Sequence, residues 1–132
     1  MREINTLEDI QKLVDAFYTR VREDDLLAPV FNEVVGVDWT AHLPRMYQFW
    51  ETVLFHTPGY KGNPVLKHVQ VSAKTPLQEA QFDRWVALWC DTVDGLYEGA
   101  RATAAKERAQ VMAKIMYYKC SQMTSGLDII KQ

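Results

Sequence analysis

The sequence has few of the residues that build metal clusters, disulfide scaffolds or thiol redox pairs. Its 132 residues include only two cysteines, Cys90 and Cys120, which lie thirty positions apart and in no CxxC arrangement. This spacing argues against a zinc knuckle, a redox dithiol and a disulfide-stabilised fold. Isolated cysteines of this kind suit a reducing compartment, so we expect a cytoplasmic protein.

Long apolar segments and a strong net charge are also missing. The longest uninterrupted apolar run, from Trp85 to Cys90, has six residues, whereas a membrane-spanning helix needs about 20. The start of the chain, Met1 to Asn5, contains an acidic residue and no apolar core, so we expect no signal peptide. Fifteen basic and seventeen acidic residues give a formal net charge of -2. Because nucleic acids and anionic membranes select strongly basic surfaces, we expect neither as a partner.

Glycine and proline are scarce, at six and five residues, and no Gly/Ser tract, charge block or repeat divides the chain. Hydrophobic residues make up 48% of the sequence and charged residues 24%. That balance supplies enough apolar material for a core and argues against disorder. Since one domain typically takes about 100 to 200 residues, we predict a single domain over residues 1–132.

Helical periodicity begins near the N-terminus. From residue 7 to about 21, apolar side chains recur at steps of four, three and four, which places them on one stripe of a helix. Thr6 and Asp9, at the start of this stripe, resemble a capping box. Residues 26–35 contain Pro29 and are followed by a glycine, so they predict at most two helical turns. The stripe of the first helix comprises Ile10, Val14, Phe17 and Val21.

A longer helix is predicted from about Thr40 to just before His56. Its apolar face follows the spacing i, +3, +4, +7, +10 and +11 from Leu43. Proline is tolerated best in the first turn of a helix, where backbone N–H groups have no partner within the helix. Pro44 therefore sets the predicted start. After an irregular stretch, residues 64–71 predict one or two further helical turns.

The C-terminal half predicts two more helices. Residues 75–78 (Thr-Pro-Leu-Gln) combine an N-cap, a proline at the first helical position and a glutamine at the third, and Gly99 is the predicted stop. The last helix is predicted over residues 101–123. No alternating strand pattern competes with these helices, so the predicted fold class is all-α. The side chains predicted to face inward from the last helix are Val111, Met112, Ile115 and Met116.

The sequence contains no motif of the common hydrolase, nucleotide-binding or calcium-binding sites. No glutamate lies three residues before a histidine, which excludes a carboxylate-bridged di-iron bundle. The chain has three histidines, His42, His56 and His68. A helical domain that directs His42 and His68 from separate elements into an aromatic interior could hold a flat, apolar cofactor that carries a metal. Haem fits this description.

Several short motifs follow one another in a specific order along the chain. In sequence they are Phe17-Tyr18, Pro29-Val30-Phe31-Asn32, Trp39-x-x-His42, Phe49-Trp50, Tyr60-x-Gly62-x-Pro64-x-x-Lys67-His68 and Phe82-x-x-Trp85. Their order and spacing resemble the truncated, 2-on-2 haemoglobins of group III over nearly the whole chain. The absence of glycine-glycine motifs agrees with that group. The resemblance implies a globin-like 2-on-2 helical sandwich around haem b.

The resemblance also implies roles for particular residues. His68 matches the proximal histidine that ligates the iron, Tyr18 the distal tyrosine that donates to a bound ligand, and Trp85 the tryptophan whose indole N–H faces that ligand. His42 matches a distal position that contacts the ligand, opens toward solvent or ligates the iron, and the choice among these roles stays open. The further residues expected to contact haem are Phe31, Arg45, Met46, Tyr60 and Lys67, with Arg45 and Lys67 as partners of the propionates.

The aromatic residues also have a simpler interpretation. Tyr18 and Trp85 lie on apolar helix stripes, where such side chains ordinarily pack in the core. Trp50 and Trp89 are expected to pack only, and His56 to be solvated. The family roles of Tyr18 and Trp85 therefore compete with a purely structural one.

The function implied by the resemblance is reversible binding of oxygen or another diatomic ligand, such as NO or CO, at a polar distal pocket. Redox chemistry on that ligand, either nitric oxide dioxygenation or peroxide reduction, is a further hypothesis. It would need a separate reductase, because the chain has no flavin or nicotinamide motif. The alternatives are a haem-based sensor or partner-binding helical domain without turnover, and a cofactor-free interaction module.

Overall fold

The structure, a computed structural model, describes residues 1–30, 39–57 and 77–131, with the side chains of residues 1–30, 40–57 and 77–121. These residues form long helices and no β-strand, and their only β-bridge joins Arg2 to Tyr97. The predicted all-α fold class is confirmed. The helices are α1 (Leu7–Glu23), α2 (Trp39–Phe55), α4 (Glu79–Leu96) and α5 (Ala100–Lys131).

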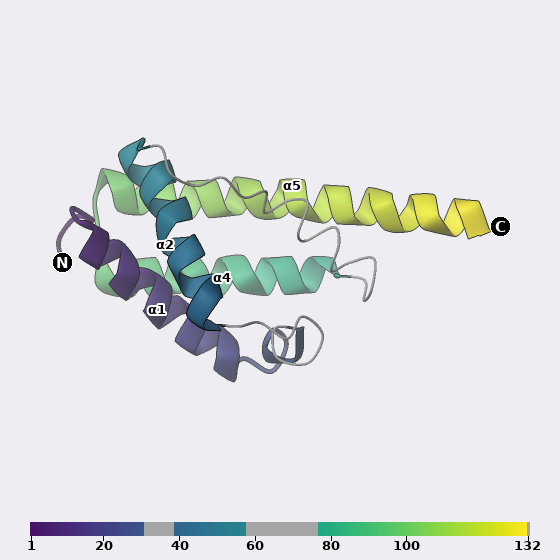
Figure 1. Cartoon of the computed structure of the whole chain (residues 1–132), viewed down its shortest axis with the longest axis horizontal. Coiled ribbons are helices and arrows are strands. Elements are labelled where there is room, and N and C mark those ends of the chain that lie inside the picture. Colours follow the sequence, from purple (N-terminus) through teal and green to yellow (C-terminus); the bar gives the residue numbers. More distant parts are fainter. Residues whose placement is uncertain (31–38, 58–76, 132) are drawn as a thin grey trace.

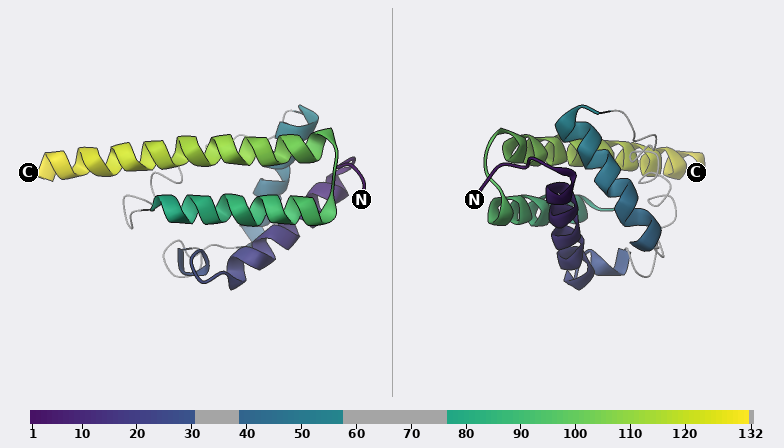
Figure 2. Two further views of the ribbon diagram at one scale, coloured as in Figure 1. Left: turned by 180° about the vertical axis from the view of Figure 1, so that it is seen from behind. Right: turned by 60° about the vertical axis from the view of Figure 1, so that its left-hand side comes forward.

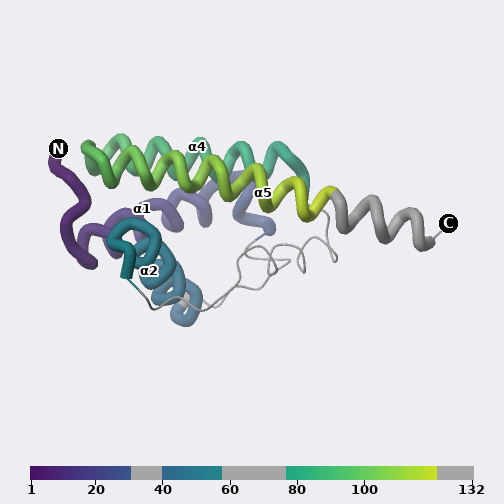
Figure 3. The backbone as a smooth tube through the Cα atoms, turned by 90° about the horizontal axis from the view of Figure 1, so that it is seen from above, coloured from purple at the N-terminus to yellow at the C-terminus, as the bar shows by residue number. Residues whose placement is uncertain are grey.

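The four helices form two layers. Helices α4 and α5 run side by side in opposite directions, and α1 and α2 lie together on one side of that pair (Figures 1 and 2). Seen from above, α2 lies beside α1, on the side of the molecule away from α4 (Figure 3). Helix α1 packs against both α2 and α4. This arrangement is the predicted globin-like sandwich of two helices on two.

Helix α1 begins where its capping residues predict. The Thr6 hydroxyl accepts a hydrogen bond from the Asp9 amide at 3.2 Å, and the Asp9 carboxylate accepts one from the Thr6 amide at 3.1 Å. This capping box satisfies two of the amides that a helix start leaves without partners. The predicted apolar stripe is confirmed as well, since its four residues, Ile10, Val14, Phe17 and Val21, are fully buried.

Helix α2 has the predicted limits to within one residue, but Pro44 lies deeper in it than expected. Because the helix begins at Trp39, Pro44 is its sixth residue and falls in the second turn. A proline at this position has no N–H to donate, so one helical hydrogen bond is lost, but the helix continues on both sides of it. The helix ends at Phe55, and His56 follows with a left-handed backbone (φ 57°). His56 is exposed, as predicted.

The predicted limits of α4 are wrong at both ends. The helix begins at Glu79 with Gln78 as its N-cap, where the Gln81 side chain accepts from the Gln78 amide at 2.8 Å. It ends at Leu96 and not at Gly99, because Tyr97 adopts an extended backbone beside Arg2 and its hydroxyl donates to the Asp9 carbonyl at 3.1 Å. A tertiary contact with the N-terminus therefore ends this helix. Gly99 has a φ of 111° in the turn that follows.

The predicted inward face of α5 is partly wrong. Met116 is buried and Met112 half-buried, but Val111 and Ile115 are 53% and 46% exposed. The buried stripe consists mainly of alanines, whose small side chains allow α4 and α5 to approach closely, so the larger apolar residues fall on other faces. The helix also continues to Lys131, past the predicted end at residue 123. The stripe comprises Ala102, Ala105, Ala109, Ala113, Met116 and Cys120.

Candidate functional site

Three residues predicted for a distal pocket are linked by a chain of edge-on ring contacts that includes Phe17. Helix α1 supplies Tyr18, α2 supplies His42 and α4 supplies Trp85. The Phe17 ring stands edge-on to Tyr18 at 4.8 Å and to Trp85 at 5.6 Å between ring centroids. The Tyr18 ring in turn stands edge-on to the His42 imidazole at 5.1 Å. Ring contacts thus link an indole of α4, through Phe17, to a phenol of α1 and an imidazole of α2.

The surroundings of these side chains are apolar. Tyr18 is only 5% exposed, the Nε2 atom of His42 is buried, and Trp85 packs against the main core. Hydrogen-bond donors in such apolar surroundings suit a small polar ligand better than a metal ion that needs several ligands. Among the described residues, no group of three or more His, Cys, Asp and Glu side chains could hold a metal ion.

Helices α1 and α2 are joined at the surface by a tyrosine–carboxylate pair. The Tyr47 hydroxyl donates to Oδ1 of Asp15. Burial of the phenol and the hydrogen bond to Asp15 raise the pKa of Tyr47 to about 12, so the phenol stays protonated at neutral pH. Because α1 carries Tyr18 and α2 carries His42, this contact helps to set the position of one relative to the other.

A buried carboxylate joins the end of α1 to α4. Asp24 accepts from Arg84 Nε at 2.7 Å and from the amides of Leu26 and Leu27 at 3.1 Å each. Burial alone would raise the pKa of Asp24, but the Arg84 hydrogen bond and the backbone amides outweigh it and lower the pKa below its ordinary value. The pair therefore anchors the turn at the end of α1 to α4.

Sequence reasoning missed both carboxylate contacts. Asp15 and Tyr47 are 32 residues apart, and Asp24 and Arg84 are 60 apart, so no local pattern connects either pair. The only local signal is that an aspartate directly after a helix commonly accepts from amides two or three residues on. Asp24 accepts from the amides of Leu26 and Leu27 in this way. That local pattern does not predict its distant partner, Arg84.

The remaining predicted haem contacts divide between described and undescribed parts of the chain. Met46 is half-buried against the core one turn after His42, and Arg45 is exposed beside it. The predicted contacts of Met46 and Arg45 with haem therefore stay predictions. Four residues lie outside the described ranges, among them the predicted iron ligand: Phe31, Tyr60, Lys67 and His68.

The two tryptophans expected only to pack are buried. Trp89 is fully buried and its indole N–H donates to the Ala105 carbonyl at 3.1 Å, while Trp50 is 3% exposed. Their rings stack at 4.4 Å with an interplanar angle of 18°. Trp89 also stands edge-on to Phe17 at 5.0 Å, so the packed core is continuous with the predicted pocket.

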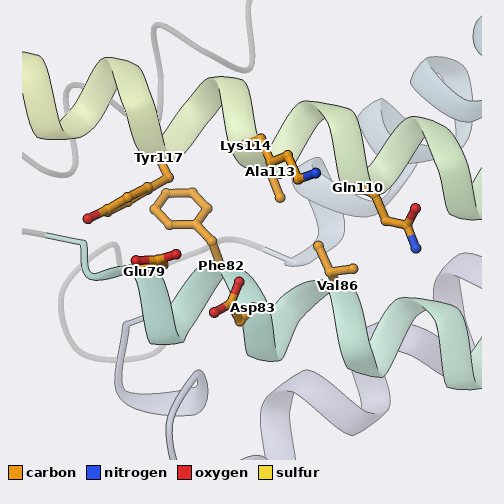
Figure 4. A pocket seen from close by; sticks show the side chains of 8 residues that line it. All are labelled: Glu79, Phe82, Asp83, Val86, Gln110, Ala113, Lys114 and Tyr117. Carbon is orange, nitrogen blue, oxygen red and sulfur yellow. The ribbon is translucent and has the colours of Figure 1, made fainter.

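A hollow between α4 and α5 lies apart from this cluster. Its volume is about 160 Å³, and the Phe82 and Tyr117 rings lie beside each other at one end of it, tilted by 56° (Figure 4). Binding pockets for drug-sized ligands typically measure about 300 to 1,000 Å³, so this hollow is too small for haem. It contains none of the predicted distal residues. Its lining consists of Glu79, Phe82, Asp83, Val86, Gln110, Ala113, Lys114 and Tyr117.

Comparisons with known proteins agree with this geometry. The bacterial-like globin family model matches residues 3–118. The group 3 truncated hemoglobin ctb of Campylobacter jejuni is 30% identical over 109 residues, which are 80% of this chain and 84% of that protein. The crystal structure of a group III truncated hemoglobin from the same organism matches with a TM-score of 0.77 and 29% identity, over 89% of this chain and 94% of that one. No helix in the described part of the chain is long and apolar enough to cross a membrane.

Proposed function

Because the chain belongs to the bacterial-like globin family, whose members bind haem, we propose that it carries haem b and binds oxygen or another diatomic ligand reversibly. We place the ligand beside Tyr18, His42 and Trp85. The observation that carries this proposal is the chain of edge-on ring contacts that runs from Trp85 through Phe17 and Tyr18 to His42 and so links three helices. We further propose a single cytoplasmic domain over residues 1–132.

The proposed site has a proximal and a distal side. When bound, haem supplies an iron centre at which a diatomic gas is held and can be reduced. On the proximal side, His68 is the proposed iron ligand; it would bind as a neutral imidazole, and a local hydrogen bond to its other ring nitrogen would fix the ring. Phe31 is proposed to pack on the haem face and Tyr60 to support it from the following loop. Arg45 and Lys67 are the proposed partners of the propionates.

On the distal side, the chain supplies hydrogen-bond donors in apolar surroundings. The Tyr18 phenol is the proposed donor to a ligand that has gained negative charge, and the Trp85 indole N–H is the second. His42 stands against the Tyr18 ring, and its proposed roles are to hydrogen-bond the ligand, to swing outward and admit the ligand, or to ligate the iron. Met46 adds a polarizable thioether to the pocket wall.

The test is the visible absorption spectrum of the purified protein and of two histidine variants. The wild-type chain should show an intense haem band. In His68→Gly the axial nitrogen is lost, so the spectrum should change, and added imidazole should restore it. His56→Gly is the matched control, because His56 is exposed with a left-handed backbone that glycine adopts readily. Unchanged haem uptake and axial spectroscopy in His68→Gly would overturn the assignment.

Turnover of the bound ligand is the finer part of the proposal. Several donors around the ligand favour tight binding and redox chemistry, either nitric oxide dioxygenation or peroxide reduction, over delivery of oxygen. Such an enzyme needs electrons from a separate reductase. The alternative is a haem-based sensor or partner-binding domain without turnover. Nitric oxide and peroxide consumption, measured beside simple oxygen release, distinguish the two.

A further inference from the structure

Three tryptophans form a stack that starts in the proposed pocket. The Trp85 and Trp89 rings lie one helical turn apart on α4, nearly parallel, with an interplanar angle of 5° and centroids 6.4 Å apart. Trp89 then stacks on Trp50 of α2 at 4.4 Å and 18°. The stack therefore leads from the pocket, through the centre of the core, into a different helix.

Beyond the end of the stack, α2 carries a half-buried tyrosine at the rim of the core. Tyr47 lies three residues before Trp50, and residues at that spacing share one face of a helix. Its phenol is part of the rim of the core and already donates a hydrogen bond to the exposed Asp15 carboxylate. An oxidisable phenol, whose proton has an acceptor in place, thus lies about one helical turn from the end of the tryptophan stack.

The chemistry of these side chains differs from that of their aromatic neighbours. Tryptophan and tyrosine lose one electron far more readily than phenylalanine does. Phe17 stands edge-on to Trp85 and Trp89, and Phe49 stands edge-on to Trp50, so the tryptophans are flanked by rings that resist oxidation. An oxidising equivalent placed on Trp85 would therefore pass along the stack.

We propose that Trp85, Trp89 and Trp50, with Tyr47 and Asp15 at the end, form a relay that carries oxidising equivalents from the haem pocket to the surface. The oxidant is hydrogen peroxide, and this inference rests on the proposed haem site. The relay would give an external one-electron donor access to the reaction without entry into the buried pocket.

The relay balances atoms and electrons. Reduction of one hydrogen peroxide to two waters consumes two electrons and two protons. Each electron leaves Trp85, is replaced in turn from Trp89, Trp50 and Tyr47, and leaves a phenoxyl radical on Tyr47 whose proton passes to Asp15 and then to water. A donor with an oxidisable hydroxyl, of the enediol or phenol class, returns a hydrogen atom to Tyr47. Two donors are oxidised by one electron each for every peroxide reduced.

The experiment treats the haem-loaded protein with one equivalent of hydrogen peroxide and a nitroso spin trap. Mass spectrometry then locates the trapped radical and electron paramagnetic resonance identifies it. We expect trapping mainly at Tyr47, although Tyr118 is 59% exposed. In Trp89→Phe the trapping at Tyr47 should fall several-fold, and oxidation should accumulate at Trp85. Asp15→Asn is an exposed change that leaves the core intact. Trapping at Tyr47 should fall several-fold in this variant too, because the proton acceptor is lost.

The control is Tyr118→Phe, which should leave trapping at Tyr47 unchanged. Equal trapping at Tyr47 in the wild type, Trp89→Phe and Asp15→Asn would mean that the stack serves aromatic packing only and would overturn the relay. Preferential trapping at Tyr118 would overturn it as well. Haem uptake and oxygen release are measured on the same samples. If haem uptake and oxygen release are normal but trapping at Tyr47 does not depend on Trp89, the relay alone is refuted. A chain that takes up no haem refutes the proposed function and the relay together.

Discussion

At the scale of single residues, the distinctive feature is a phenol held in an apolar setting. Tyr18 is nearly fully buried, and the rings of Phe17 and His42 stand edge-on against its own. A hydrogen bond from a neutral donor to a charged acceptor contributes about 1.5 to 3 kcal/mol. A group of this kind in the proposed pocket would therefore control how long a polarised ligand stays bound.

Replacement of Tyr18 by phenylalanine tests that role. Tyr18→Phe removes the hydroxyl and keeps the ring, so packing against Phe17 should survive. Since about 1.4 kcal/mol corresponds to a factor of ten, oxygen dissociation should accelerate roughly tenfold or more. Stopped-flow displacement of oxygen by carbon monoxide measures the rate, with Tyr118→Phe on the outer face of α5 as the control. An unchanged rate would leave Tyr18 a packing residue.

At the scale of elements, the contact between α4 and α5 depends on small side chains. The buried stripe of α5 is made chiefly of alanines, and the large apolar Val111 and Ile115 are turned outward. A reading by hydrophobicity alone ranks valine and isoleucine above alanine and therefore selects the wrong face. The close approach of the two backbones, which no single-residue scale represents, decides which face is buried.

The same substitution at two alanines of α5 tests this packing. Ala109 is fully buried against α4, and Ala104 is exposed on the same helix. Ala109→Leu should lower the free energy of unfolding by about 1 to 3 kcal/mol, because a well-packed interface has no room for the added atoms. Ala104→Leu should change it by less than about 0.5 kcal/mol. Urea denaturation of both variants measures the difference, and equal stabilities would contradict a tight contact.

At the scale of the whole molecule, a few long-range polar contacts hold separate helices in place. Asp24 at the end of α1 binds Arg84 of α4, and Asp15 of α1 binds Tyr47 of α2. Asp9 in the cap of α1 accepts from Tyr97 just after α4. These contacts surround the aromatic core, so they set the relative positions of the helices that carry the proposed distal residues.

The Asp24 contact should make the stability of the fold depend on pH. The folded state lowers the pKa of Asp24, so near and below the ordinary aspartate pKa the unfolded chain binds more protons than the folded one. The stabilisation is complete above the unfolded pKa, about 3.9, and is lost as pH falls through the lower folded value. Asp24→Asn should therefore destabilise the protein at pH 7 by about 1 to 3 kcal/mol.

The measurement is the free energy of unfolding of wild type and Asp24→Asn between pH 7 and pH 3. The difference between them should shrink toward the acid end. Asp25→Asn, at the adjacent exposed aspartate, is the matched control and should follow the wild type. A difference that stays constant across this range would show that the Asp24 charge does not stabilise the fold.

Much of the architecture could be predicted because its signals are local. The capping box and stripe of α1, the limits of α2 and the all-α class depend on residues within a turn or two of each other. The ordered motifs also pointed to the globin family, which the comparisons confirm. The roles of individual site residues remain predictions, and His68 lies outside the described residues.

The positions of most helices follow from local sequence, since helical periodicity and capping need only near neighbours along the chain. Helix packing sets the end of α4 at Leu96, the alanine face of α5 and the chain of ring contacts from Trp85 through Phe17 and Tyr18 to His42. Each of these depends on groups that are far apart in sequence and meet only when the helices pack. Local propensity gives several helix faces and helix ends nearly equal free energies. Side-chain size and long-range hydrogen bonds then select which face is buried and where the helix ends.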